Sequence, residues 1–437
     1  MNLGELKRPF VVAVALLLGL HGLALAHTRL VSSEPAANAH LAEGPRLVRL
    51  VFSEPVGSRL ARITVVAADS SVRTLTPESD PRNVRALIAP VDGLGAGAYR
   101  LNWRIVSADG HPIEGTFTFH VDAPAAPADT TPPAPPPAPP TSEPASWGPS
   151  VAGAPIVPAT LRGLAIGTLM AAAGLLLFFV LHQPGMETRP GRILTWVTAA
   201  ATGLVIVHFA AWLMNISPEH RLDSGEMAAA FGTMPGRVEL ARVMLTVLAL
   251  WAIALARRPG LALIFAGAAL LLSGASGHPA GMQPLWAIPA KALHLAAASA
   301  WFGGLLWIVL RERDDLAVYV DEAKRVSSIA LPAVLVVALS GIVQARLFLP
   351  STADLWSTTY GLVALAKAGG LGVLVIFGAR HRHSLPRLRD LPAAADLRAS
   401  VGREVGVMAL VILLGGFLAY IPPAEPDTFT ATAGPIR

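Results

Sequence analysis

Long apolar segments are the feature that most constrains what this chain can fold into. Between residues 157 and 421 they recur at about 20 residues each, the length that an α-helix needs to cross a bilayer. Only 14% of the residues are charged, against about 25% in an average soluble domain. This deficit excludes a nucleic-acid-binding or disordered chain and predicts a membrane protein.

We predict eight membrane-spanning helices in this region. Their expected bounds are 157–181, 193–214, 237–256, 260–277, 286–310, 327–348, 361–380 and 403–421. One set of connecting segments is rich in basic residues, namely Arg189, Arg192, Arg257, Arg258, Arg311, Arg313, Lys324, Arg325, Arg380, Arg382, Arg387, Arg389, Arg398 and Arg403. The opposite loops hold Arg221 and little else. The positive-inside rule places the basic set in the cytoplasm, and residues 422–437 then form a periplasmic tail.

The N-terminus has the pattern of a secretion signal over residues 1–26. Lys7 and Arg8 precede an apolar run, and Ala24-Leu25-Ala26 is a small-residue cleavage site. Cleavage after Ala26 makes His27 the first residue of the mature chain and exports the domain that begins there. This agrees with the orientation given by the basic loops. We therefore expect a multi-pass protein of the cytoplasmic (inner) membrane whose N-terminal domain is periplasmic.

Residues 27–122 predict a small exported β domain. Apolar and polar residues alternate over 46–52, 61–66, 99–106 and 116–121, the pattern of half-buried strands. Short strands separated by Gly- and Pro-rich turns favour a β-sandwich or a small barrel. A Pro-rich linker, 123–156, comes next. It holds eleven prolines between residues 123 and 150, which favours a polyproline II tether.

A candidate metal site lies directly after the strand that ends at Val106. Asp109 and His111 flank Gly110, so a turn there can aim both side chains at one point. His27 adds its imidazole and, after cleavage, the α-amine of the mature terminus. Two imidazoles, an amine and a carboxylate form a tetragonal nitrogen and oxygen set, which suits Cu(II). The chain has no cysteine, which excludes disulfides and thiolate metal sites.

Polar residues of the membrane region gather in the outer halves of the predicted spans, whereas the inner halves are almost wholly apolar. His208, Met244 and His294 lie on three predicted helices, each about 9–12 Å below the outer surface. His278 and Met282 lie just beyond the outer end of the fourth span. Imidazole suits several transition metals and thioether favours Cu(I). These five residues are therefore candidates for a copper pathway.

Other interpretations of these residues remain open. Each His or Met also fits simple helix packing, and His208 and His294 also fit the axial positions of a b-type haem in a membrane redox protein. His381 and His383 lie in a basic stretch that we expect to be a solvated cytoplasmic loop, so they are weaker metal candidates. The chain has no Gly-Lys-Ser/Thr phosphate-binding loop, which disfavours ATP-driven transport.

Several motifs resemble a known pair of families. His27-Thr28, residues 32–36, residues 50–56 and residues 99–112 resemble the CopC copper-resistance family, and this similarity covers 27–122. Residues 273–278 and 294–305 resemble the CopD family, and this more diffuse similarity covers 157–421. The whole chain resembles a CopC–CopD fusion.

The resemblance implies an all-β cupredoxin-like or immunoglobulin-like Greek-key barrel, joined by the Pro-rich linker to an α-helical membrane bundle of eight transmembrane helices. It implies Cu(II) binding by His27, Asp109 and His111. CopC members with two copper sites carry a Met-rich Cu(I) segment, whereas this chain has no methionine between Met1 and Met170. We therefore expect the exported domain to bind Cu(II) only.

The resemblance also implies a membrane partner for copper uptake. We expect capture of Cu(II) outside the cytoplasmic membrane and handover to the transmembrane domain for import or membrane delivery. Cu(I) is expected in the membrane domain, and a periplasmic copper donor is an expected partner. A reduction step would lie between the two sites, yet the sequence shows no reductant, and we assign no enzymatic activity. The alternative without transport is a periplasmic copper-sequestering resistance protein.

Overall fold

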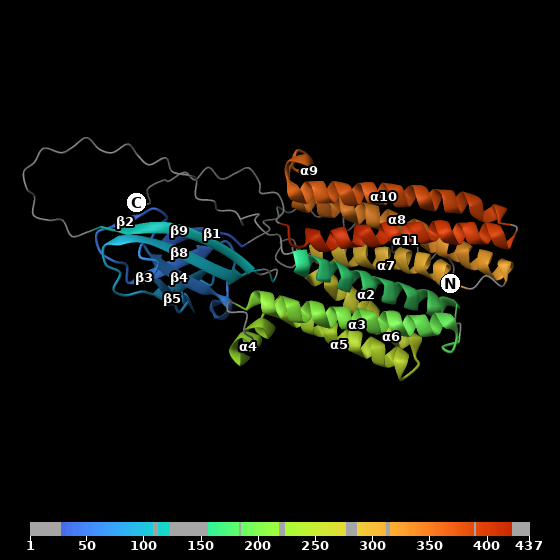
Figure 1. Ribbon diagram of the computed structural model, residues 1–437, viewed down its shortest axis with the longest axis horizontal. Coiled ribbons are helices and arrows are strands. Elements are labelled where there is room, and N and C mark those ends of the chain that lie inside the picture. The colour runs from blue at the N-terminus through green and yellow to red at the C-terminus, as the bar shows by residue number, and fades with distance from the viewer. Residues whose placement is uncertain are drawn as a thin grey trace, which may run out of the picture. The chain divides into compact units, whose positions relative to one another are not determined.

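The computed structural model describes residues 28–107, 110, 112–122, 156–182, 185–217, 223–276, 286–311, 315–388 and 390–421. These form two compact units (Figure 1). The β unit consists of the described residues among 27–154 together with the described residues among 210–239. The helical unit holds the remaining described residues from 156 onward. The predicted signal peptide, the centre of the Pro-rich linker and the periplasmic tail lie outside the described residues.

The β unit is a sandwich of two sheets. The four-stranded sheet has the order β1-β3-β7-β6, and the five-stranded sheet has the order β2-β9-β8-β4-β5. The strand bounds are β1 Leu30–Glu34, β2 His40–Leu41, β3 Leu47–Phe52, β4 Arg62–Ala67, β5 Val72–Leu75, β6 Glu78–Ser79, β7 Ala86–Pro90, β8 Gly97–Val106 and β9 Pro112–Val121. The all-β prediction is thereby confirmed, as a two-sheet sandwich.

Period-2 patterning explains which strand residues form the core. On β8, Tyr99, Leu101, Trp103 and Ile105 are buried, because successive side chains of a strand point to opposite faces. β8 and β9 form an antiparallel hairpin whose last pair is Val106 with Pro112. The hairpin therefore presents the predicted ligand loop, residues 107–111, at its closed end. Of this loop, the structure describes Ser107 and Gly110.

An ion pair joins strand β3 of the four-stranded sheet to the loop between β6 and β7. The guanidinium of Arg49 on β3 donates to Asp80 at 2.8 Å, directly after β6. The backbone N–H of Arg82 also donates to this carboxylate at 2.9 Å. These two hydrogen bonds, the backbone one first, hold the pKa of Asp80 below its ordinary value.

Each of the eight predicted spans coincides with a helix or, for the fourth, with a helix and a short 3-10 turn. The bounds are α2 Ile156–His182, α3 Arg189–Ile216, α5 Met234–Ala254, α6 Pro259–Leu272 with η2 Ser273–Ala275, α7 Ala287–Leu310, α8 Leu316–Phe348, α10 Thr359–Ser384 and α11 Leu391–Leu418. Two short helices, α4 Ser224–Gly232 and α9 Asp354–Ser357, lie between them.

Six of these helices, within the described residues, are long and apolar enough to cross a membrane: α2, α3, α7, α8, α10 and α11. α5 does not meet this measure because Arg237, Glu239 and Arg242 lie within its 21 residues, and α6 has only 14 residues. The count of eight spans therefore stays a prediction, and six is the number that length and composition support.

Two helices begin well before their predicted bounds. α8 begins at Leu316 rather than at residue 327, and α11 begins at Leu391 rather than at residue 403. Asp315 and Asp390 are the N-caps of these helices, and their carboxylates accept backbone N–H groups of the first turn. Hydropathy detects the apolar part of a helix, so polar extensions of this kind were missed.

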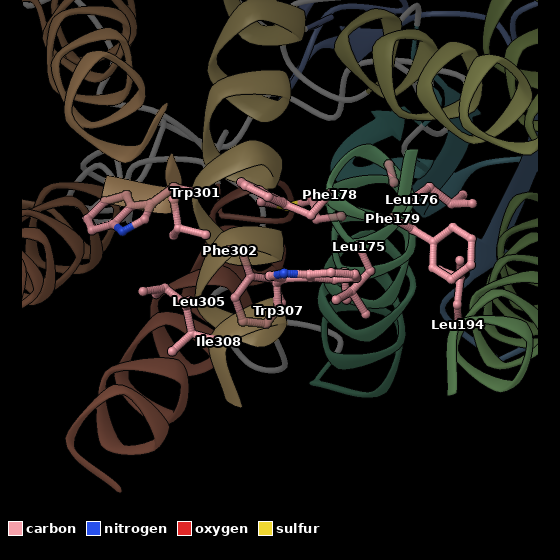
Figure 2. Packing of buried hydrophobic residues seen from close by; sticks show 14 of the residues in the cluster. Leu175, Leu176, Phe178, Phe179, Leu194, Trp301, Phe302, Leu305, Trp307 and Ile308 are labelled. Atoms are coloured by element: carbon pink, nitrogen blue, oxygen red, sulfur yellow. The ribbon is translucent and has the colours of Figure 1, made fainter. Parts of the chain in front are cut away.

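Helices α2 and α7 touch backbone to backbone. A Cβ on Gly303 would lie 2.2 Å from the carbonyl carbon of Gly174, so only glycine fits at this crossing. Beside it, the hydroxyl of Ser299 donates to the carbonyl of Met170 at 2.8 Å. Figure 2 shows the core next to this contact, where Trp307 of α7 packs edge-on against Phe179 of α2, with 6.5 Å between the ring centroids. Residues 294–305, noted in the sequence, thus include a helix-packing motif.

Candidate functional site

The predicted ligands His27, Asp109 and His111 lie outside the described residues. The next residue after His27, Thr28, is buried, and its hydroxyl donates to the carboxylate of Glu54 at 2.8 Å. Thr28 is therefore anchored to the residues just after β3.

Gly110, between Asp109 and His111 in the sequence, forms part of the turn that connects β8 to β9. Its N–H donates to the carbonyl of Ser107 at 2.9 Å, which closes a tight turn. Its φ is +86°, in the region that favours glycine over residues with a Cβ. The turn between β8 and β9 therefore depends on glycine at position 110.

His294 on α7 is the pathway candidate with the most defined surroundings. Its Nδ1 lies 2.8 Å from the hydroxyl of Ser340 on α8. That hydroxyl lies 2.5 Å from the carbonyl of Val336 and 3.2 Å from that of Val337, so its single proton is directed at a backbone carbonyl. Ser340 then accepts the Nδ1–H of His294. We assign this tautomer from the hydrogen-bond network, and it leaves a lone pair on Nε2, as in metal-binding imidazoles.

Two cations have a structural role at Ser276, at the end of the α6–η2 segment. The ammonium of Lys291 donates to the carbonyl of Ser276 at 2.6 Å, and the buried Arg162 of α2 donates to the Ser276 hydroxyl at 3.0 Å. Ser276 comes directly after η2, so both cations meet the C-terminal end of the α6–η2 segment, where positive charge is favourable. Through Ser276, the described part of the 273–278 motif thus connects α2 and α7 by hydrogen bonds.

The other pathway candidates have different environments. His208 on α3 is 1% exposed, whereas Met244 on α5 is 58% exposed. His278 and Met282 lie outside the described residues. Among the residues that the structure does describe, no group of three or more His, Asp or Glu could hold a metal ion. Equal depth does not place side chains together, because each helical residue turns the side chain by about 100°.

A buried polar pair between the last turn of α10 and the middle of α11 was missed in the sequence. Nδ1 of His381 lies 2.9 Å from the carboxylate of Glu404, and its Nε2 lies 2.9 Å from the hydroxyl of Ser400. The prediction that His381 lies in a solvated loop is wrong, because α10 continues to Ser384 and the His381 side chain is 13% exposed. The available signal in the sequence was the polar pair Ser400 and Glu404, which lie one helical turn apart and therefore on one face of α11.

A second buried carboxylate lies near the start of α8. Glu322 is 6% exposed and accepts the Nε–H of Arg311 at 2.8 Å and the indole N–H of Trp307 at 3.3 Å. Both donors come from the end of α7 that is distant from His294. Glu322 lies outside the predicted span 327–348, whereas Glu404 lies within the predicted span 403–421 and is a buried exception to the expectation of almost wholly apolar inner halves.

Comparison with known proteins identifies both parts of the chain. Residues 30–122 match the CopC domain, and residues 321–418 match the family described as copper resistance protein D, CopD. Copper resistance protein C of Escherichia coli is 34% identical over 121 residues, which cover 25% of this chain and 94% of that protein. The chain belongs to the CopC family. It also carries a CopD domain, so the expected CopC–CopD fusion is confirmed.

Similarity also extends across the whole CopC–CopD chain. Copper transport protein CutJ of Bacillus subtilis (strain 168) is 26% identical over 450 residues, which cover 96% of this chain and 79% of CutJ. The crystal structure of CopC from Methylosinus trichosporium OB3b matches with 28% identity and a TM-score of 0.22, covering 23% of this chain and all of that one. The function is copper-related, copper is the expected ion, and the CopD region is consistent with a multi-pass membrane protein.

Proposed function

We propose that this chain captures Cu(II) outside the cytoplasmic membrane and passes copper to its own membrane domain, for import or membrane delivery. The observation that carries the proposal is the union of a CopC domain and a CopD domain in one polypeptide. The similarity to CutJ, named a copper transport protein, over 96% of this chain supports the same assignment.

The capture site consists of His27, Asp109 and His111. The α-amine of His27 has an intrinsic pKa near 8, so a metal ion displaces its proton at small cost near neutral pH. The Thr28–Glu54 hydrogen bond restricts the residue next to this terminus, and the Gly110 turn restricts the loop that bears the other two ligands. Neither of these two contacts uses a ligand atom.

The membrane receiver includes His294. Its Nδ1–H is engaged by Ser340, which orients the ring and leaves Nε2 as the ligand atom. His208, Met244, His278 and Met282 are the further pathway candidates. An orientation with the basic loops in the cytoplasm places the CopC domain and the His294 end of α7 on the periplasmic side.

Metal content tests the proposal. Signal-cleaved protein, purified in detergent and loaded with copper, is analysed for copper and iron per chain. We expect two coppers and no iron, with one copper lost in His27→Ala and one lost in His294→Ala. His383→Ala, which changes an exposed histidine of α10, is the matched control and should retain both.

Two results would contradict the proposal. A single copper in the wild-type chain, unchanged in His294→Ala, would restrict copper binding to the CopC domain and remove His294 from the route. Stoichiometric iron would instead favour a haem redox protein with His208 and His294 as axial ligands. Copper accumulation in cells should also fall in His294→Ala and stay unchanged in His383→Ala.

A further inference from the structure

The loop that bears two of the proposed copper ligands is held by side chains from a distant stretch of the β unit. The indole N–H of Trp212, in the last turns of α3, donates to the carbonyl of Gly110 at 2.9 Å, and this hydrogen bond is buried. Gly110 lies between Asp109 and His111 in the sequence. Trp212 thus binds the backbone of the ligand loop at its centre.

The same glycine is enclosed on a second side. A Cβ on Gly110 would lie 2.8 Å from Cβ of Pro235, in the first turn of α5, and 3.4 Å from Nε1 of Trp212. Space and backbone conformation therefore both require glycine at this position. The loop backbone fits between the end of α3 and the beginning of α5, and this fit is independent of the ligand side chains.

A second hydrogen bond fixes the hairpin to the same stretch. The guanidinium of Arg104 on β8 donates to the carbonyl of Asn215 at 2.6 Å. Asn215 lies in the last turn of α3, where backbone carbonyls have no partner within the helix and attract cations. Neither contact uses His27, Asp109 or His111, so both are compatible with a copper-loaded loop.

We propose that the described residues among 210–239, through Trp212, Asn215 and Pro235, form a receiver surface that recognises the backbone of the copper loop of this chain's own CopC domain. His208 precedes Trp212 by four residues on α3, so it lies on the same helix face, about 6 Å further along the axis. It is also buried. His208 is therefore the pathway candidate nearest in sequence to Trp212. This inference rests on the proposed function and names the entry point of its route.

The test compares two tryptophans of one helix. Trp212→Phe removes the indole donor, whereas Trp196→Phe changes a residue of α3 that is 76% exposed. Amide hydrogen exchange of the peptide containing residues 107–111 is measured by mass spectrometry in the full-length, copper-loaded protein. We expect exchange to rise severalfold in Trp212→Phe and to match wild type in Trp196→Phe. Cellular copper accumulation should fall only in Trp212→Phe.

A second variant leaves α3 untouched. Gly110→Ala should reproduce the rise in exchange at the loop, because its methyl group would collide with Pro235. Wild-type exchange in Trp212→Phe would overturn the receiver surface, as would wild-type copper accumulation in that variant. Retention of Cu(II) in Trp212→Phe is expected. Absence of Cu(II) from the wild-type chain would instead contradict capture by His27, and would therefore be a failure of the proposed function. Because the copper content of the wild-type chain is measured separately from exchange at the loop, this failure is distinguished from a failure of docking.

Discussion

Nδ1 of His381 lies 2.9 Å from the carboxylate of Glu404, and this pair joins α10 to α11 where almost no water reaches the carboxylate, which is 1% exposed. A buried charge without a partner is costly, so each residue makes the other tolerable. Ser400, on the other side of the imidazole, fixes the ring orientation. The pair therefore defines how the last two long helices meet.

Removal of one partner should destabilise the helical unit. We expect Glu404→Ala to reduce the free energy of unfolding by about 3 kcal/mol, since it removes one member of a buried pair. Thermal unfolding in detergent measures the effect. Asp396→Ala, at an exposed position of the same helix, is the control and should change the midpoint little. Equal midpoints for the two variants would show that the pair does not stabilise the bundle.

The backbone contact of α2 with α7 should not tolerate a methyl group. We expect Gly303→Ala to cost about 1–3 kcal/mol, because the new Cβ would overlap the backbone of Gly174. Gly372→Ala on α10 is the matched control, since a Cβ there meets no atom within 4 Å. Unfolding in detergent compares the two. A loss in Gly372→Ala as large as that in Gly303→Ala would argue against close packing as the cause.

Ser340 should control copper binding at His294 without contacting the metal. We expect Ser340→Ala to weaken copper binding at the membrane site by about 10-fold, because the Nδ1–H loses its acceptor. Ser340→Thr should restore affinity. Ser328→Ala, on the exposed face of α8, is the control, since the Ser328 hydroxyl donates to the carbonyl of Arg325 in its own helix. Unchanged affinity in Ser340→Ala would exclude the hydrogen bond from ligand orientation.

Acid should weaken the β unit partly through Asp80. The pKa of Asp80 is lowered by the Arg82 backbone N–H and by Arg49, so the folded state favours the carboxylate. The resulting stabilisation is complete above the unfolded pKa, about 4, and is lost as the pH falls through the lower folded pKa. Asp80→Asn should flatten this acid dependence, measured by unfolding at pH 2–6. Asp92→Asn, at an exposed loop position, should leave the slope as in wild type.

The absence of cysteine makes the orientation easy to measure, because any introduced thiol is the only one. Ser224→Cys lies on α4, in a segment that we expect outside, and Asp321→Cys lies on α8, in a segment that we expect inside. A membrane-impermeant maleimide should label Ser224→Cys in intact cells and Asp321→Cys only after lysis. The reverse pattern would invert the topology and remove the CopC domain from the periplasm.

Patterns along the chain were sufficient to predict the elements of the fold but not the polar pairs between them. Alternation located β3 and β8, and hydropathy located the apolar part of α8. Hydropathy could not show that α10 continues through His381, because the residues there are charged and only tertiary contact with α11 explains their helix. Residue types and their spacing proposed His27, Asp109 and His111 as a metal site, and the family resemblance implies the same set.

Side-chain direction limited what could be predicted of the membrane site. His208 and Met244 share a predicted depth, yet one is buried and the other mostly exposed, because depth does not fix the helix face. The Trp212–Gly110 hydrogen bond leaves no trace in the sequence, since its acceptor is a backbone carbonyl and every residue has one. Such contacts depend on tertiary structure alone.

The glycine contacts of α2 bear on how the bundle moves. α2 meets α7 at Gly174 and meets α11 at Gly163, where a Cβ on Gly416 would lie 2.6 Å from the Gly163 Cα. A helix with backbone contacts on two neighbours cannot slide or roll without separating from one of them. α2, α7 and α11 therefore act as a fixed frame. Any gate that opens and closes during copper passage has to be built from the helices outside that frame.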